Sequence, residues 1–258
     1  MRKKALLSHA LALGILSFGA VAHAADATRS AKPTVVFVHG AFADGSSWSK
    51  VIPILQAQGI KTVAVQNALD SLDGDVAATR RAIEDQPGRV VLVGHSWGGT
   101  VITQAGIHDR VAALVYVAAF APSVGQSSGE LGKDYPPAPG LANLVPDKAG
   151  YLWLPDEVLR QHFAQDLGKS ELDLMVATQG PVQAKAFDEK VTTAAWTSKP
   201  SWYIVAENDH MIVPDLQRAL AKKIGAKVTS LPTSHVPMQS RPVDVAKVIL
   251  AAVAAMSK

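Results

Sequence analysis

Gly94-His95-Ser96-Trp97-Gly98 is the stretch that decides the fold class of this chain. An apolar, β-rich run at residues 89–93 comes directly before it, and a stretch with helical spacing at residues 100–106 follows it. A turn of this kind exposes a serine hydroxyl, and glycines two positions before and after the serine relieve backbone crowding. The pentapeptide alone arises by chance in about one chain of this length in ten at ordinary residue frequencies, so its context carries the prediction. We expect a nucleophile elbow with Ser96 at its tip.

A serine hydroxyl needs a base to remove its proton, and an imidazole held by a carboxylate is the usual arrangement. With an elbow of this kind, the partners follow along the chain in the order serine, acid, histidine. Asp209 comes just after a predicted strand at residues 201–206, and His235 comes just after another at residues 227–231. The sequence therefore predicts Ser96 as the nucleophile, Asp209 as the orienting acid and His235 as the base.

Other acidic residues and histidines near these positions compete for the same roles. Glu207 is the weaker candidate for the acid because it lies closer to the end of its strand, and Asp215 falls in the first turn of a predicted helix, where it complements the dipole. His210 adjoins the proposed acid and has poor reach as a base. His39 and His95 end buried strands, so we expect hydrogen-bonded structural roles for both.

The negative charge that develops on an attacked carbonyl oxygen needs hydrogen-bond donors, and removing one typically costs about 3 to 4 kcal/mol of barrier. In folds with this elbow the donors are backbone amides. We expect them from Trp97, after the serine, and from Ala41, in the loop after a strand at residues 34–38. Six aromatic side chains are candidates for an apolar substrate pocket, with internal packing as the alternative: Phe42, Phe120, Tyr151, Trp153, Phe163 and Trp196.

Short apolar runs alternate with longer stretches of helical spacing, which is typical of an α/β fold with a mainly parallel sheet flanked by helices. Ten Pro or Gly residues at positions 121–150 interrupt this rhythm, and residues 156–195 look helical. We interpret residues 121–195 as an inserted helical cap, with a long surface loop as the alternative. The six predicted strands span residues 34–38, 61–65, 89–93, 111–117, 201–206 and 227–231, and further helices are predicted at 48–58, 75–85, 216–224 and 243–256.

Residues 1–24 have the composition of a secretory signal peptide. Three basic residues, Arg2, Lys3 and Lys4, precede an apolar stretch that ends in Ala22-His23-Ala24. A transmembrane anchor is the alternative, but small residues at both cleavage positions favour removal after Ala24. We therefore expect one α/β domain at residues 25–258, which is exported to the periplasm or secreted. It should have no stable membrane span once the signal is removed.

Charge and cysteine content exclude several function classes. The chain has 25 Lys and Arg residues against 22 Asp and Glu residues, and without the three basic residues of the leader the net charge falls from +3 to zero. No basic surface for nucleic acid remains to be explained. The chain has no cysteine, and its histidines lack metal-ligand spacing. We expect no nucleic-acid partner, no metal and no cofactor.

These motifs resemble the α/β-hydrolases, in the branch that holds plant methylesterases, hydroxynitrile lyases and related bacterial esterase-like proteins. The resemblance covers nearly all of the chain after the leader. It rests on Val36-Phe37-Val38-His39-Gly40-Ala41, on residues 94–99, on residues 203–209 and on Ser234-His235. It implies the α/β-hydrolase fold, and it implies the same catalytic residues and oxyanion amides that the motifs indicate.

Two positions separate the branches of this family. The lyases have threonine where this chain has Gly40, and they have a lysine directly after the catalytic histidine, where this chain has Val236. That lysine supplies positive charge near the cyanide leaving group, so its absence argues against cyanogenic activity. Dehalogenases and many epoxide hydrolases of the fold use an aspartate nucleophile, and Ser96 argues against both.

The sequence thus predicts hydrolysis of a small carboxylic ester, as in a carboxylesterase, through an acyl-enzyme formed on Ser96. A lactonase or an amidase would use the same residues and is the enzymatic alternative. A ligand-binding or sensor protein without catalysis is the third hypothesis, because a pocket of this fold alone can bind a small molecule.

Overall fold

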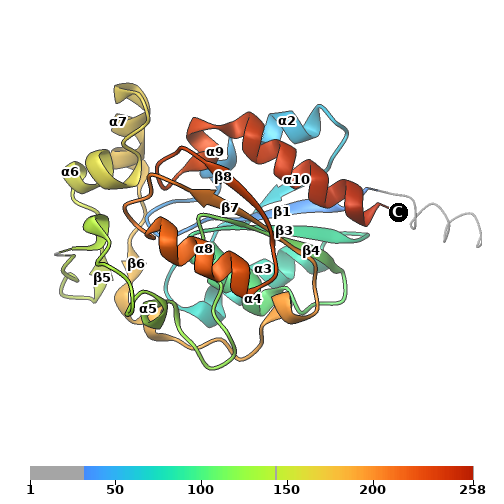
Figure 1. Ribbon diagram of the computed structural model, residues 1–258, viewed down its shortest axis with the longest axis horizontal. Coiled ribbons are helices and arrows are strands. Elements are labelled where there is room, and N and C mark those ends of the chain that lie inside the picture. The colour runs from blue at the N-terminus through green and yellow to red at the C-terminus, as the bar shows by residue number, and fades with distance from the viewer. Residues whose placement is uncertain (1–31, 143, 258) are drawn as a thin grey trace, which may run out of the picture. The chain divides into compact units, whose positions relative to one another are not determined.

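The structure is a computed structural model that describes residues 32–142 and 144–257. The predicted signal peptide at residues 1–24 lies outside the described residues. Within them, Figure 1 shows a twisted sheet with helices packed on both of its faces. Among the helices of this described part, none is both long enough and apolar enough to cross a bilayer.

The six strands of the main sheet are all parallel and follow the order β2-β1-β3-β4-β7-β8. Side chains of β1, β3, β4 and β7 are buried along their whole length, which explains why these segments read as continuous apolar runs. All six predicted strands are confirmed, with ends that differ by two residues at most. Their bounds are β1 Thr34–Val38, β2 Thr62–Ala64, β3 Val90–His95, β4 Val111–Val117, β7 Ser201–Ala206 and β8 Lys227–Leu231.

The helices that connect these strands cover the sheet on two sides. In Figure 1, α2 (Ile52–Gln56) and α10 (Pro242–Met256) lie over one face, and α3 (Leu72–Glu84), α4 (Trp97–Ala105) and α8 (Pro214–Lys223) lie over the other. Proline occupies the first turn of α2, α8 and α10, where its missing N–H costs no hydrogen bond. The elements agree with the α/β class predicted from the sequence.

The chain between β4 and β7 holds the segment that we interpret as a cap. Figure 1 shows most of its elements gathered at one end of the main sheet. The expectation of helix over residues 156–195 is confirmed at 156–163, 169–178 and 184–188 and is wrong for the rest. Gly180-Pro181 cannot continue the helix that ends at Thr178, and the chain turns into a strand there. The elements are α5 (Ser128–Leu131), η2 (Pro139–Leu141), β5 (Tyr151–Leu152), α6 (Asp156–Val158), the π-helical turn η3 (Leu159–Phe163), α7 (Lys169–Thr178), β6 (Val182–Gln183), η4 (Ala184–Asp188) and η5 (Ala195–Thr197).

Candidate active site

Ser96 occupies the sharp turn between β3 and α4. Its backbone has φ 51° and ψ −119°, a conformation that side chains other than glycine rarely adopt. A Cβ atom on Gly94 would lie 2.6 Å from the carbonyl oxygen of Gly98, and one on Gly98 would collide with the carbonyl oxygen of Val38. The two glycines of the motif are therefore required by close backbone approach, and the turn has the geometry predicted for a nucleophile elbow.

Asp209 and His235 form a buried pair at the carboxyl edge of the sheet. The Nδ1 atom of His235 lies 2.7 Å from Oδ2 of Asp209, and the two residues are 1% and 2% exposed. The same carboxylate accepts the backbone N–H groups of Met211 at 2.7 Å and Ile212 at 3.0 Å, and the side-chain amide of Gln217 at 2.7 Å. An ionised carboxylate only accepts, so Nδ1 of His235 donates to it and Nε2 is left free to act as a base.

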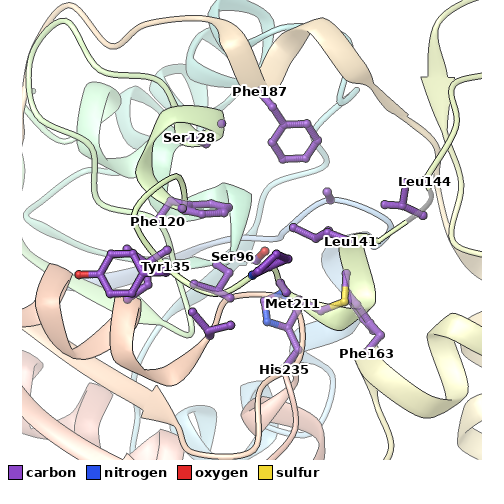
Figure 2. A pocket seen from close by; sticks show the side chains of 18 of the residues that line it. Ser96, Phe120, Ser128, Tyr135, Leu141, Leu144, Phe163, Phe187, Met211 and His235 are labelled. Carbon is purple, nitrogen blue, oxygen red and sulfur yellow. The ribbon is translucent and has the colours of Figure 1, made fainter.

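Ser96 and His235 line the same cavity, as Figure 2 shows. No hydrogen bond joins their side chains in the residues that the structure describes. Such contacts are often long without substrate and shorten in the reactive complex. The structure thus brings the three predicted catalytic residues to one site, with the acid and base already paired.

Ala41 and Trp97, the two residues predicted to bind an oxyanion through their amides, both belong to the surroundings of Ser96. Ala41 lines the cavity, and Trp97 supplies the first amide of α4, where helix N–H groups have no partner within the helix. The indole Nε1 of Trp97 donates to Oδ2 of Asp75 at 2.8 Å, and its ring packs on Phe187 with centroids 5.3 Å apart. These side-chain contacts fix the first turn of the helix behind the nucleophile.

Asp75 is a residue that the sequence analysis did not single out. It is fully buried on α3, where its carboxylate accepts from Trp97 and from the backbone N–H of Leu69 at 3.0 Å. Burial raises the pKa of this carboxyl above its usual range, and the two hydrogen bonds oppose the shift. Nothing near Asp75 in the sequence points to this role, because its partner lies 22 positions away.

His39 orders the loop that carries Ala41. Its Nε2 accepts the backbone N–H of Asn67 at 2.9 Å, so Nδ1 carries the hydrogen and donates to the carbonyl oxygen of Gly40 at 2.9 Å. Burial lowers the pKa of His39, which favours this neutral form. The arrangement agrees with the structural role expected from the sequence.

His95 links the nucleophile elbow to the loop of the base. Its Nε2 donates to the carbonyl oxygen of His235 at 2.8 Å, and the two rings lie 4.7 Å apart between centroids. Complete burial holds the pKa of His95 well below its usual range, and the nearby His235 acts in the same direction. His95 is therefore a neutral donor that ties the two catalytic segments together.

A cavity of about 420 Å³ opens beside Ser96 and His235. Three of the six aromatic side chains predicted to line a pocket do so: Phe42, Phe120 and Phe163. Phe42 has φ 61° directly after Ala41, so the backbone is strained on both sides of the predicted oxyanion site. The sequence analysis missed other lining residues, which come from the cap, from the loop after β7 and from the first turn of α8: Ser128, Gly129, Gly132, Tyr135, Pro136, Pro137, Ala138, Leu141, Leu144, Leu152, Phe187, Met211, Ile212, Val213 and Leu216.

The other three aromatic predictions are corrected by the structure. Leu152 on β5 lines the cavity, and side chains alternate along a strand, so its neighbour Tyr151 points away from it. Trp153 follows the strand and does not line the cavity either. The hydroxyl of Tyr151 donates to Asp70 at 2.6 Å, and Trp153 is 47% exposed. Trp196 donates from Nε1 to the carbonyl oxygen of Pro122 at 2.9 Å, outside the cavity.

The rival acids and the rival base take other partners. Glu207 and Asp215 both pair with Arg218 near the surface, the second at 2.7 Å. His210 lies with its Nδ1 3.1 Å from Nδ1 of His162 in the cap. In the described ranges, no group of three or more histidine or acidic side chains could hold a metal ion.

A parallel α/β sheet with a serine elbow after an inner strand, and with an acid and a histidine at its carboxyl edge, defines the class of the α/β hydrolases. The family model described as the alpha/beta hydrolase family matches residues 35–248, and the chain belongs to this family. The resemblance stated from the motifs is confirmed.

Curated relatives include proteins named as esterases and hydrolases. The chain is 28% identical over 249 residues to the pyrethroid hydrolase of Sphingobium wenxiniae, with 83% of this chain and 85% of that protein covered. It is 25% identical over 256 residues to methylesterase 2 of Arabidopsis thaliana, with 82% and 92% covered. Relatives with these names support hydrolysis of an ester.

Solved structures show the same fold. Polyneuridine aldehyde esterase superposes with a TM-score of 0.76 at 19% identity, with 86% of this chain and 99% of that chain covered. The Arabidopsis methylesterase MES16 superposes with a TM-score of 0.71 at 23% identity, with 86% and 99% covered.

Proposed function

We propose that this protein is a serine esterase that cleaves uncharged, apolar carboxylic esters through an acyl-enzyme. The observation that carries the proposal is the buried Asp209–His235 pair, 2.7 Å apart, beside Ser96 in a largely apolar cavity. The esterase names of the relatives support the same reaction class.

The proposal assigns a residue to each step of the reaction. His235 Nε2 takes the proton of Ser96 as Oγ attacks the ester carbonyl, and Asp209 stabilises the imidazolium that forms. The amides of Ala41 and Trp97 receive the charge that develops on the carbonyl oxygen. His235 then protonates the alcohol as the C–O bond breaks, and it next activates a water that releases the acid from Ser96.

The cavity lining supports an uncharged substrate. Phenylalanine, leucine, proline and methionine side chains dominate the surface, and the described residues that line it include no lysine, arginine, aspartate or glutamate. Moving a charged group into such surroundings without a partner costs several kcal/mol or more, so charged acyl or alcohol groups are disfavoured. The volume of about 420 Å³ lies within the range of small-molecule sites.

Labelling with a fluorophosphonate, located by peptide mass spectrometry, tests the nucleophile. We expect modification of Ser96 in the wild-type protein and none in Ser96→Ala. Ser198→Ala, which changes a serine outside the cavity, should label as the wild type does. A folded wild-type protein that neither labels nor hydrolyses p-nitrophenyl esters would favour the ligand-binding hypothesis.

Matched substrates test the reaction class and the substrate class. We expect kcat/KM to be higher for an apolar ester than for the amide or the lactone of the same acyl group. A neutral acyl chain should be preferred over one of similar size that ends in a carboxylate. A clear preference for the amide or the lactone would contradict the proposed esterase activity.

We also propose that the protein is exported through residues 1–24 and acts in the periplasm or outside the cell. The basic start, the apolar stretch and Ala22-His23-Ala24 support this proposal. N-terminal sequencing of the protein from periplasmic and culture fractions tests it. Mature chains should begin at Ala25, and intact chains in the cytoplasm would contradict it.

A further inference from the structure

We infer that residues 162–166 of the cap, here called the strap, are a positioning element for the catalytic acid and base. This inference rests on the proposed function. The strap begins at the end of the π-helical turn η3 and contacts both loops that carry catalytic residues. It thus connects the substrate cavity to the Asp209–His235 pair.

The strap contacts the base loop in two ways. Phe163 is 1% exposed, and its ring meets the ring of His235 edge to face, with centroids 5.2 Å apart. Asp166 accepts the backbone N–H of Ser234, the residue before His235, through Oδ2 at 2.9 Å. Figure 2 shows Phe163 beside His235 at the cavity wall. One contact limits the tilt of the imidazole, and the other fixes the backbone that carries it.

The strap also contacts the acid loop. The side-chain amide of Gln165 donates to the carbonyl oxygen of Asn208, next to Asp209, at 2.7 Å. His162 lies against His210, on the other side of the acid, with Nδ1 atoms 3.1 Å apart. The acid loop is therefore held from both sides of its catalytic residue.

The π-helical turn explains how one short segment reaches both loops. The N–H of Ala164 bonds to the carbonyl oxygen of Leu159 at 3.0 Å, which closes a turn one residue wider than that of an α-helix. An extra residue rotates the following side chains by about 100° about the helix axis. Single turns of this kind are frequent at functional sites.

The position of the acid and base loops matters because catalysis requires close alignment. A base displaced by about 1 Å can cost up to roughly 100-fold in rate. The acid and base loops are themselves joined by the hydrogen bond from Asn208 N to the carbonyl oxygen of Thr233 at 3.0 Å. Gln165 bonds to Asn208 at one end of this link, and Asp166 bonds to Ser234, next to the other end. Neither Gln165 nor Asp166 lines the cavity, so loss of their bonds should misalign His235 without changing the cavity lining.

Kinetics on three variants test the strap. Asp166→Ala and Gln165→Ala should each lower kcat roughly 10-fold, with KM changed less than about threefold, because the lost interaction acts on the transition state. Asp166→Asn keeps an oxygen acceptor for Ser234 and should recover most of the rate. Gln161→Ala is the matched control, because the Gln161 amide bonds to Glu157 within the cap, and it should retain the wild-type kcat.

Hydrogen exchange separates positioning from activity. In a Ser96→Ala background, Asp166→Ala should speed amide exchange in the peptide that covers residues 232–237, and Gln161→Ala should not. This measurement does not need turnover. An inactive wild-type protein would therefore refute the proposed function, and the exchange result would still test whether the strap positions the base loop. Unchanged exchange together with unchanged kcat in Asp166→Ala and Gln165→Ala would overturn the inference.

Discussion

Asp209→Asn should remove most of the catalytic rate by forcing the wrong tautomer on His235. Oδ1 of Asp209 accepts two backbone N–H groups, from Met211 at 2.7 Å and Ile212 at 3.0 Å. Backbone donors cannot become acceptors, so an asparagine must keep its oxygen at this position. Its NH₂ group then takes the place of Oδ2, where the carboxylate now accepts from His235.

Gln217 donates to the Oδ2 position and so favours an oxygen there, but the two backbone donors at the Oδ1 position outweigh this single donor. The Gln217 oxygen accepts the backbone N–H of Ala206 at 2.9 Å, and its nitrogen donates to Ile212 O and to Asp209 Oδ2, both at 2.7 Å. The new amide must therefore donate to Nδ1 of His235, which moves the ring hydrogen to Nε2. A protonated Nε2 in a neutral ring cannot accept the proton of Ser96.

The expected loss in kcat is about 1,000- to 10,000-fold, which corresponds to about 4 to 5.5 kcal/mol of barrier. Steady-state hydrolysis of a p-nitrophenyl ester measures it. Asp215→Asn makes the same chemical change at a side chain that is 73% exposed, and its kcat should stay within about threefold of the wild type. A folded Asp209→Asn protein with kcat within about tenfold of the wild type would refute the tautomer argument.

Three further changes test the surroundings of the site. The folded state keeps His95 neutral with its pKa well below 6.5, so the unfolded chain binds more protons than the folded chain below that pH. The free energy of unfolding, measured in urea, should therefore fall as pH drops through 6.5, by at most about 1.4 kcal/mol per pH unit from this group. In His95→Gln this fall should be less steep. Gly98→Ala should not yield folded protein by circular dichroism, because its Cβ would collide with a backbone carbonyl, whereas Gly88→Ala has open space and should fold. Asp75→Ala should lower the free energy of unfolding by roughly 1–3 kcal/mol for each buried donor that it leaves unpaired. It should also lower kcat/KM, because the indole of Trp97 loses its partner. A loss of stability at unchanged kcat/KM would show that the indole contact serves folding alone.

The parts of the fold that depend on local pattern could be predicted from the sequence. β1, β4, β7 and β8 begin and end at the predicted residues, because strands in a parallel sheet read as uninterrupted apolar runs that end where turns begin. The placement of Asp209 and His235 could also be predicted, because parallel strands bring their carboxyl ends to one edge of the sheet.

The cavity lining could not be predicted in the same way. Residue type alone made Tyr151 and Trp153 pocket candidates, but Leu152 between them lines the cavity, and the alternation of β5 turns Tyr151 away from it. That outcome depends on β6 pairing with β5, where Leu152 lies opposite Val182, 30 positions away, and Tyr151 opposite Gln183, 32 positions away. The roles of Asp75 and Asp166 were not predicted either, because their partners Trp97 and Ser234 are distant in sequence.

The three histidines around Ser96 show that the hydrogen-bond acceptor, and not the residue type, decides which one can act as the base. His39 and His95 donate to the backbone carbonyls of Gly40 and His235, which are neutral acceptors, and burial lowers the pKa of both rings. Of the three, only His235 donates to a carboxylate, whose negative charge would stabilise the imidazolium of the proposed mechanism. A positive charge on His95, with ring centroids 4.7 Å apart, would oppose that imidazolium, so a neutral His95 is a condition for catalysis as well as for folding.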